Sequence, residues 1–80
     1  MTYLLTYYTP DGAFCQSIES LATLAGKIDA MDGLHYTEVR VYEIRQREVI
    51  QRGWVYNRKI RTLWLLDRYM NTVGMYTKED

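Results

Sequence analysis

Four short strand-like stretches, three of them rich in β-branched and aromatic residues, constrain the fold of this chain more than any other feature. They cover residues 2–9, 13–16, 37–44 and 48–56. In the first stretch Tyr3, Leu5 and Tyr7 alternate with other strand-forming side chains, which is typical of a strand with little exposure. Residues 10–12, Pro-Asp-Gly, match a tight turn because proline fixes φ and glycine accepts a positive φ. We therefore predict two β-hairpins.

The register of the second hairpin stays open. In a regular strand over residues 37–44, Val39 and Val41 would point to one face and Tyr42 and Ile44 to the other. This pattern fits a strand buried on both faces or one that changes phase at a bulge. Gly53, inside the following stretch, indicates a bulge or a bend.

Two segments carry apolar residues at helical spacing. In the first, Ser17 can cap a helix whose apolar residues recur over residues 18–31. In the second, apolar residues over 60–73 mark one face of a helix that Gly74 ends. The order ββαββα predicts an α+β fold, a small two-layer sandwich of an antiparallel sheet and two helices. A strand in place of the second helix is the main alternative, and residues 57–60 are compatible with either.

Length and composition limit the possibilities further. The 80 residues form a single domain, residues 1–80, because a chain this short cannot build a second core. With 48% hydrophobic and 25% charged residues it lies outside the disordered class, and its zero net charge gives no bulk attraction to nucleic acid or anionic lipid. One cysteine excludes an internal disulfide and no stretch approaches the roughly 18 apolar residues of a membrane span. We expect a cytoplasmic protein with no membrane association.

Catalytic chemistry has little support. The sequence holds one histidine and one cysteine and lacks a glycine-rich phosphate loop, so we expect no enzyme, no metal and no cofactor. Cys15 and His35 have no local signature of a nucleophile pair, and we interpret them as a small buried hydrophobe and a polar turn residue. Asp29 and Asp32 lack a third ligand, and a solvated helix end explains them more simply.

Charge is unevenly distributed along the chain. Residues 1–39 hold one basic and five acidic residues, whereas residues 40–68 hold eight basic and three acidic residues. Seven of those eight are arginine, whose planar fork binds carboxylate or phosphate at two points and which therefore indicates contact with a partner. The arginines of the second hairpin have another interpretation, as cross-strand pairs with Glu38, Glu43 and Glu48 on a solvated face.

The predicted second helix supplies the candidate binding surface. Its face opposite the core carries Arg58, Arg61, Leu65, Arg68 and Tyr69. Arginine and tyrosine around an exposed leucine are typical of an interface centre, and Arg45 and Arg47 of the neighbouring hairpin extend it. If Asn57 caps this helix, Arg58 and Lys59 fall in its first turn, where a bound anion would offset the unfavourable dipole. If the helix begins nearer Thr62, that penalty does not exist.

The opening hairpin, the stretch SIESLATLAGKIDAM and the stretch EVRVYEIRQREVIQRGW resemble small accessory proteins of phages and mobile elements, including anti-CRISPR and other anti-defence inhibitors. The resemblance implies a compact non-enzymatic protein that occludes a site on a larger, often nucleic-acid-binding, protein in the host cytoplasm. It transfers no family residue to a position in this chain.

Three functions are compatible with these observations. The first is a binding module that inhibits or modulates a protein partner with an acidic or nucleic-acid-binding surface. The second is a nucleic-acid-binding protein, in which the same arginines contact phosphates and Trp54, Tyr56 or Tyr69 stacks on bases. The third is a homo-oligomer formed through Leu65 and Tyr69.

Overall fold

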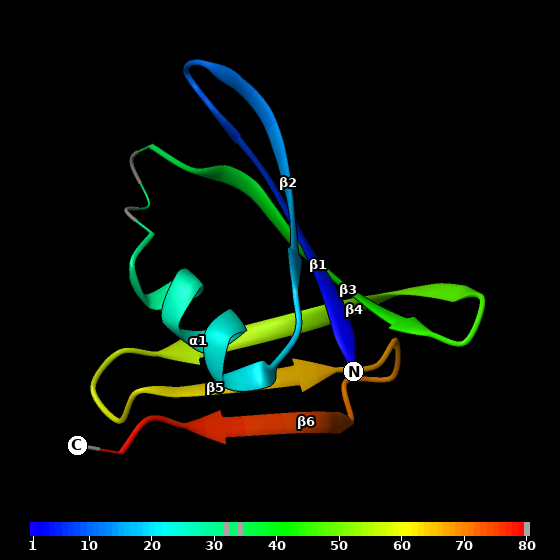
Figure 1. Cartoon of the computed structure of the whole chain (residues 1–80). Helices are drawn as coiled ribbons and strands as arrows, with labels where there is room; N and C mark the ends of the chain where they lie inside the picture. The colour runs from blue at the N-terminus through cyan, green and yellow to red at the C-terminus, as the bar shows by residue number, and fades with distance from the viewer. Residues whose placement is uncertain (32, 34, 80) are drawn as a thin grey trace.

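The computed structural model describes residues 1–31, 33 and 35–79. Within these residues the chain forms six strands and one helix (Figure 1). The elements are β1 (Thr2–Thr9), β2 (Gly12–Ile18), α1 (Leu21–Asp29), β3 (Thr37–Arg45), β4 (Glu48–Asn57), β5 (Thr62–Leu66) and β6 (Thr72–Thr77). All neighbouring strands are antiparallel, in the order β2-β1-β3-β4-β5-β6. The α+β prediction with two helices is therefore wrong, and the fold is β-rich.

The sheet is sharply bent where β4 changes partner. Its first half pairs with β3, which sets Tyr42 opposite Gln51 and so defines the register of the second hairpin. From Gly53 onward it pairs with β5 instead. Trp54 lies beside this separation, and its indole Nε1 donates a hydrogen bond to the carbonyl oxygen of Val39 at 3.0 Å. Figure 1 shows the result, with β1 and β2 running steeply across the direction of β5 and β6.

The core lies on the concave face of the bent sheet, under α1. The helix contacts β1, β2, β4 and β6, and Leu24, Ala25 and Ile28 are its buried residues. Alternate side chains of the strands pack against the helix, because successive side chains in a strand point to opposite faces of the sheet. The buried hydrophobic residues of the strands are Tyr3, Leu5, Tyr7, Ile18, Val41, Leu63 and Leu65.

The first helix exists but is shorter than predicted. Its N-cap is Ser20, whose side chain accepts a hydrogen bond from the Thr23 amide at 3.1 Å. Ser17 belongs instead to β2, where it lies opposite Leu4 of β1, so strand pairing extends past the predicted cap. The helix ends with Ala30 as C-cap. Across the described residues, no helix is long and apolar enough to cross a membrane.

The second predicted helix is replaced by β5, a turn and β6. The apolar run of β5 satisfies helical spacing and a buried strand equally, because a run this short carries no decisive period. The turn then breaks the helical pattern. Asp67 Oδ1 accepts hydrogen bonds from the amides of Tyr69 and Asn71, at 2.8 and 2.9 Å, and the Asp67 amide donates to the Asn71 carbonyl at 2.9 Å. The alternative of a strand in this segment is the correct one.

Candidate functional site

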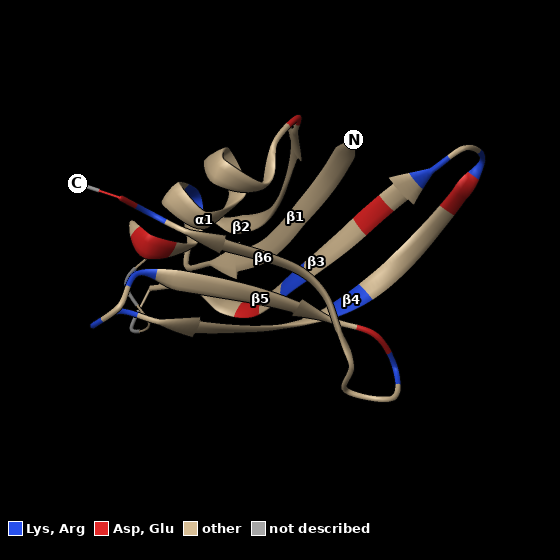
Figure 2. Ribbon diagram, turned by 90° about the horizontal axis from the view of Figure 1, so that it is seen from below, with Lys and Arg blue, Asp and Glu red and all other residues tan. Residues whose placement is uncertain are grey.

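The structure does not bring the predicted binding arginines together. Arg47 lies in the β3–β4 turn with Arg45 just before it, Arg58 and Arg61 lie in the β4–β5 turn, and Arg68 lies in the β5–β6 turn. Figure 2 shows these basic positions at separate ends of the molecule. The first two turns are divided by the ten residues of β4, about 33 Å of extended chain. The single basic face of a second helix is not formed.

Leu65 is the clearest correction at the site. It was expected to be an exposed residue at the centre of an interface, but its exposed fraction is 0%. In a strand its side chain points to the concave face beside Leu63 and packs in the core. A partner therefore cannot contact this side chain on the folded protein.

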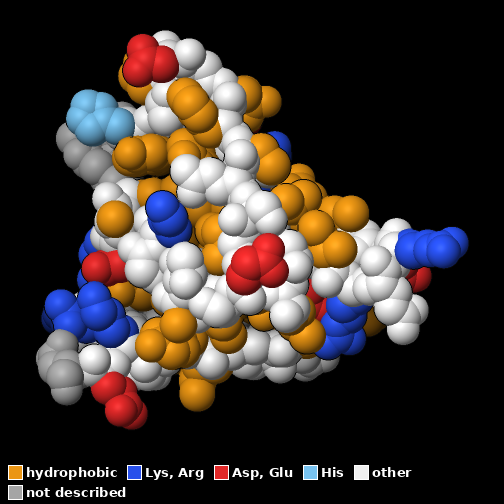
Figure 3. Space-filling view, viewed as in Figure 1, with side chains coloured by type: hydrophobic (Ala, Val, Ile, Leu, Met, Phe, Trp, Pro, Cys, Tyr) orange, Lys and Arg blue, Asp and Glu red, His pale blue; other side chains and the backbone are white. Residues whose placement is uncertain are grey.

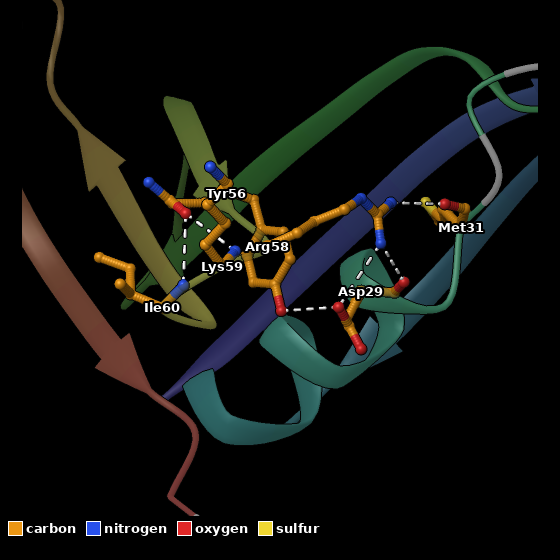
Figure 4. Close-up of polar contacts among 7 residues, drawn as sticks. Asp29, Met31, Tyr56, Arg58, Lys59 and Ile60 are labelled. Carbon is orange, nitrogen blue, oxygen red and sulfur yellow. Dashed lines mark hydrogen bonds and ion pairs between the residues drawn. The ribbon is translucent and has the colours of Figure 1, made fainter.

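Arg58 forms hydrogen bonds with the C-terminal end of α1 (Figure 4). Its guanidinium donates hydrogen bonds to the carbonyl oxygens of Asp29 and Met31, at 2.7 and 2.8 Å. A cation at a helix C-terminus is favourable, whereas the sequence had suggested a helix N-terminus for the same residue. Tyr56 completes the cluster by donating to Asp29 Oδ1 at 2.7 Å, and burial together with this carboxylate raises the pKa of Tyr56. No local sequence signal connects Arg58 to a helix that lies so far back in the chain.

The β4–β5 turn also settles how residues 57–60 are arranged. Asn57 ends β4, and its Oδ1 accepts hydrogen bonds from the amides of Lys59 and Ile60 at 2.9 and 3.3 Å. Asn57 therefore caps a turn, as asparagine commonly does. The dipole penalty foreseen for Arg58 and Lys59 does not arise, because no helix begins here.

The arginines of the second hairpin divide between the two interpretations. Arg52 Nη2 contacts Glu43 Oε2 at 3.1 Å, which is a cross-strand pair as predicted, whereas Arg45 Nε contacts the same oxygen at 2.6 Å from the same strand. The pair is not on a solvated face, however, because the Glu43 side chain is 3% exposed. Arg47 is exposed in the turn itself.

Tyr69 and Arg68 are held together at the surface. Arg68 lies over the Tyr69 ring, 4.9 Å from its centroid, and donates to the Tyr69 hydroxyl at 2.7 Å. The other two aromatic candidates, Trp54 and Tyr56, are half-buried against the core. They line a hollow of about 300 Å³ beside the end of α1.

The remaining candidate residues are separate. Cys15 is exposed on β2, so its interpretation as a buried hydrophobe is wrong. His35 is exposed between α1 and β3, as a polar residue after the helix should be. Asp29 contacts Arg58 and Tyr56, whereas Asp32 lies outside the described residues.

A different surface stands out on the outer, convex face of the sheet. Val55, Trp64 and Met75 lie directly opposite one another on β4, β5 and β6. Val55 and Met75 are 48% and 58% exposed, and Val73 on β6 is exposed as well. Neither β5 nor β6 contains a charged residue. We call Val55, Trp64 and Met75 the outer apolar row.

This row ends at an open sheet edge. β6 is the last strand of the sheet and pairs only with β5. The Lys78 amide donates to the Arg61 carbonyl at 2.9 Å, so by the alternation of an antiparallel ladder the amides of Thr77 and Met75 point away from β5, toward the open edge. Edge strands usually carry lysine, proline or inward-pointing charge that prevents pairing with another chain. The β6 sequence, TVGMYT, has none of these.

Basic residues lie at one end of this edge. Lys59 and Arg61 belong to the β4–β5 turn, and Lys78 directly follows β6 beside Arg61. Among the described residues, Glu79 is the acidic residue next to them. The described residues at this end of the edge strand are therefore mostly basic, and the strand itself has no charged residue.

The sequence analysis missed this surface because it placed the binding surface where the arginines are concentrated. The signal that could have found it is the absence of charge over residues 69–77, together with their content of threonine, valine and tyrosine. Comparison with known proteins adds nothing to the geometry, since no family model, curated protein or solved structure matches this chain.

Proposed function

We propose that this protein is a small, non-enzymatic protein-binding module that takes up an extended segment of a partner protein along β6. The observation that carries the proposal is the open, charge-free edge of β6, at which the outer apolar row ends. Inhibition or modulation of that partner, in the cytoplasm of a host cell if the gene is carried by a phage, belongs to the same proposal.

Strand addition uses the two features that β6 offers. The outward amides and carbonyls of the edge provide main-chain hydrogen bonds, and pockets or rows for alternate side chains provide selectivity. A segment paired with β6 places every second side chain on the outer face of the sheet. One of them lies beside Met75, in line with Trp64 and Val55. Those side chains must be apolar or uncharged, because a charge there would lose its hydration without gaining a partner.

The basic residues at the end of the β6 edge indicate which charge the rest of the bound segment should carry. Where it passes Lys59, Arg61 and Lys78, acidic residues would be favoured. A second copy of this chain fits less well. In an antiparallel pairing of β6 with itself, this basic end would meet the copy's β5–β6 turn, which carries both Asp67 and Arg68 and so offers no net negative charge. We therefore assign the edge to another protein whose segment is uncharged and then acidic.

The test compares two substitutions of the same kind at equal exposure. Met75→Lys places a cation on the edge strand, whereas Val49→Lys places one on the outer face of the β3–β4 hairpin, where Val49 is 60% exposed. Affinity capture from the native cells should recover one protein with the wild type and with Val49→Lys. Met75→Lys should bind that purified protein at least about tenfold more weakly, the equivalent of roughly 1.4 kcal/mol. Thermal melts of both variants provide the control for folding.

Hydrogen exchange on the purified complex identifies the contact. We expect slower exchange at the amides of Met75 and Thr77 and in a partner segment that is uncharged and then acidic. Equal binding by Met75→Lys, or protection confined to other strands, contradicts the proposal. Capture that nuclease abolishes would favour the nucleic-acid alternative, and a dimer of the free protein that Met75→Lys dissociates would favour the homo-oligomer.

A further inference from the structure

A second feature, independent of β6, lies where the β3–β4 hairpin meets the β5–β6 turn. Glu43 and Arg52 face the concave side there, and their side chains are 3% and 10% exposed. Glu43 Oε2 accepts from both Arg52 and Arg45, so two guanidinium groups share one carboxylate. Glu43 and Arg52 are buried, whereas the Arg45 side chain is 55% exposed, and the three charges together have an excess of one positive charge.

Arg52 is also incompletely hydrogen-bonded. Among the residues that the structure describes, its Nε is the buried side-chain nitrogen without an acceptor. Buried polar groups in folded proteins nearly always have a partner, so an orphaned donor of a charged side chain calls for a specific explanation. The acceptor would have to come from outside the protein.

The structure offers a place from which it can come. A hollow of about 330 Å³ adjoins Arg52 and is lined by Ile50, Gln51, Arg52, Asp67, Arg68 and Tyr69. Arg68 is held at its rim by its hydrogen bond to the Tyr69 hydroxyl and by its position over the ring. Two guanidinium groups from different elements therefore contribute to the wall of one hollow.

The acidic residue of the hollow, Asp67, offsets one of the positive charges. The Asp67 carboxylate accepts hydrogen bonds from the amides of Asn71 and Tyr69 within its own turn. The amide of Asn71 in particular lowers the pKa of Asp67, and the nearby charge of Arg52 lowers it as well, so this residue stays ionised but engaged. Counting Arg45, Glu43, Arg52, Asp67 and Arg68, one positive charge remains without a counter-charge.

We propose that this hollow binds a small oxyanion, a carboxylate or phosphate group, between Arg52 and Arg68. The anion supplies the acceptor that Arg52 Nε lacks and the negative charge that the cluster lacks, and arginine forks are suited to both groups. Arg52 Nε is itself buried, so contact with the anion requires the side chains around it to move.

The probes are inorganic phosphate and acetate, each titrated against chloride at constant ionic strength. Binding is followed by NMR through the amides of Arg68 and Tyr69 and through the Nε–H signal of Arg52. We expect saturable shifts of all three signals with at least one probe below about 50 mM, and none with chloride. Saturation by acetate alone assigns a carboxylate ligand, and saturation by phosphate alone assigns a phosphorylated one; either supports the site.

Variants separate a built site from general attraction. Arg68→Gln should weaken binding at least about fivefold. Arg47→Gln makes the same charge change in the β3–β4 turn, outside the lining of the hollow, and should leave binding unchanged. Arg52→Lys keeps the positive charge next to Glu43 but lacks Nε, and should lose saturable binding. The proposal is overturned if neither probe saturates, if chloride produces the same shifts, or if Arg47→Gln weakens binding as much as Arg68→Gln, since the anion would then be adventitious. None of these results depends on β6.

Discussion

The strands β3 and β4, in the middle of the sheet, differ from the other four strands in their content of charged residues. All charged residues that lie within strands belong to β3 and β4: Glu38, Arg40, Glu43, Arg45, Glu48 and Arg52. The other four strands have no charged residue. Natural sheets usually place charge at their edges to prevent pairing with other chains, and this sheet does the reverse.

The difference reflects what each region contacts. The tip of the β3–β4 hairpin extends away from α1 and the core (Figure 1), so its strands must be stable in water on their own. Exposed charged residues such as Arg45, Arg47 and Glu48 gather at this tip, whereas Glu43 and Arg52 are buried closer to the core. The strands β5 and β6 obtain their stability from the core on one face and leave the other face and one edge apolar. On the face that Figure 3 shows, hydrophobic side chains likewise gather over the β1–β2 hairpin. The neutral edge of β6 is therefore the feature on which the proposed binding of a partner segment rests.

The largest expected effect comes from the core side of β5. Leu65→Ala should reduce the free energy of unfolding by about 3 kcal/mol, because it removes a fully buried side chain and leaves a cavity. Val55→Ala, on the outer face of the neighbouring strand, should cost less than about 1 kcal/mol. Urea denaturation measures both. Equal losses would mean that the outer apolar row is part of the stabilising core and not an available surface.

The second prediction concerns the charged middle of the sheet. Glu43→Gln should destabilise the protein by about 2 kcal/mol, because Arg52 stays buried without its carboxylate. Glu48→Gln, at an exposed position of the same hairpin, should change stability by less than about 0.5 kcal/mol. Replacing Glu43 and Arg52 together by leucine should restore most of the loss. If the double variant is as unstable as Glu43→Gln, packing and not charge pairing holds this region.

The smallest effect is an acid dependence of the β5–β6 turn. Backbone amides, first that of Asn71 and then that of Tyr69, lower the pKa of Asp67 below its ordinary value of 3.8. A carboxylate with a depressed pKa stabilises the folded state above its unfolded pKa, and this contribution is lost as the pH falls through the folded pKa. The protection of the Tyr69 and Asn71 amides, measured as the exchange rate relative to the intrinsic rate at the same pH, should decrease below about pH 4. Asp67→Asn should remove this pH dependence, and an unchanged profile in that variant would show that another group is responsible.

Local patterns predicted the parts of the fold that local interactions control. The strand at residues 2–9 and the two hairpins are confirmed, because alternation and turn residues act within a few positions. The first helix was found but its start was displaced, since pairing of Ser17 and Ile18 with β1 outweighs the cap that Ser17 could form. The second helix failed because a five-residue apolar run has no period of its own.

The candidate site was less predictable for a related reason. Whether Leu65 is exposed depends on helix or strand geometry, which reverses the face that its side chain occupies. Arg58 could not be assigned to the end of α1 without knowing that β4 passes beside it. The pairing of Glu43 with Arg52 was foreseeable from residue type, but its burial was not.

Local patterns in the sequence indicated two hairpins and one early helix, and showed that most arginines follow an acidic first half. Where those charges lie depends on the tertiary structure, because the antiparallel order of the strands sends consecutive turns to opposite ends of the molecule. The tertiary structure also places two uncharged strands, β2 and β6, at the edges of the sheet. An edge is defined by the strand that is missing beside it, and no property of a single segment records that absence.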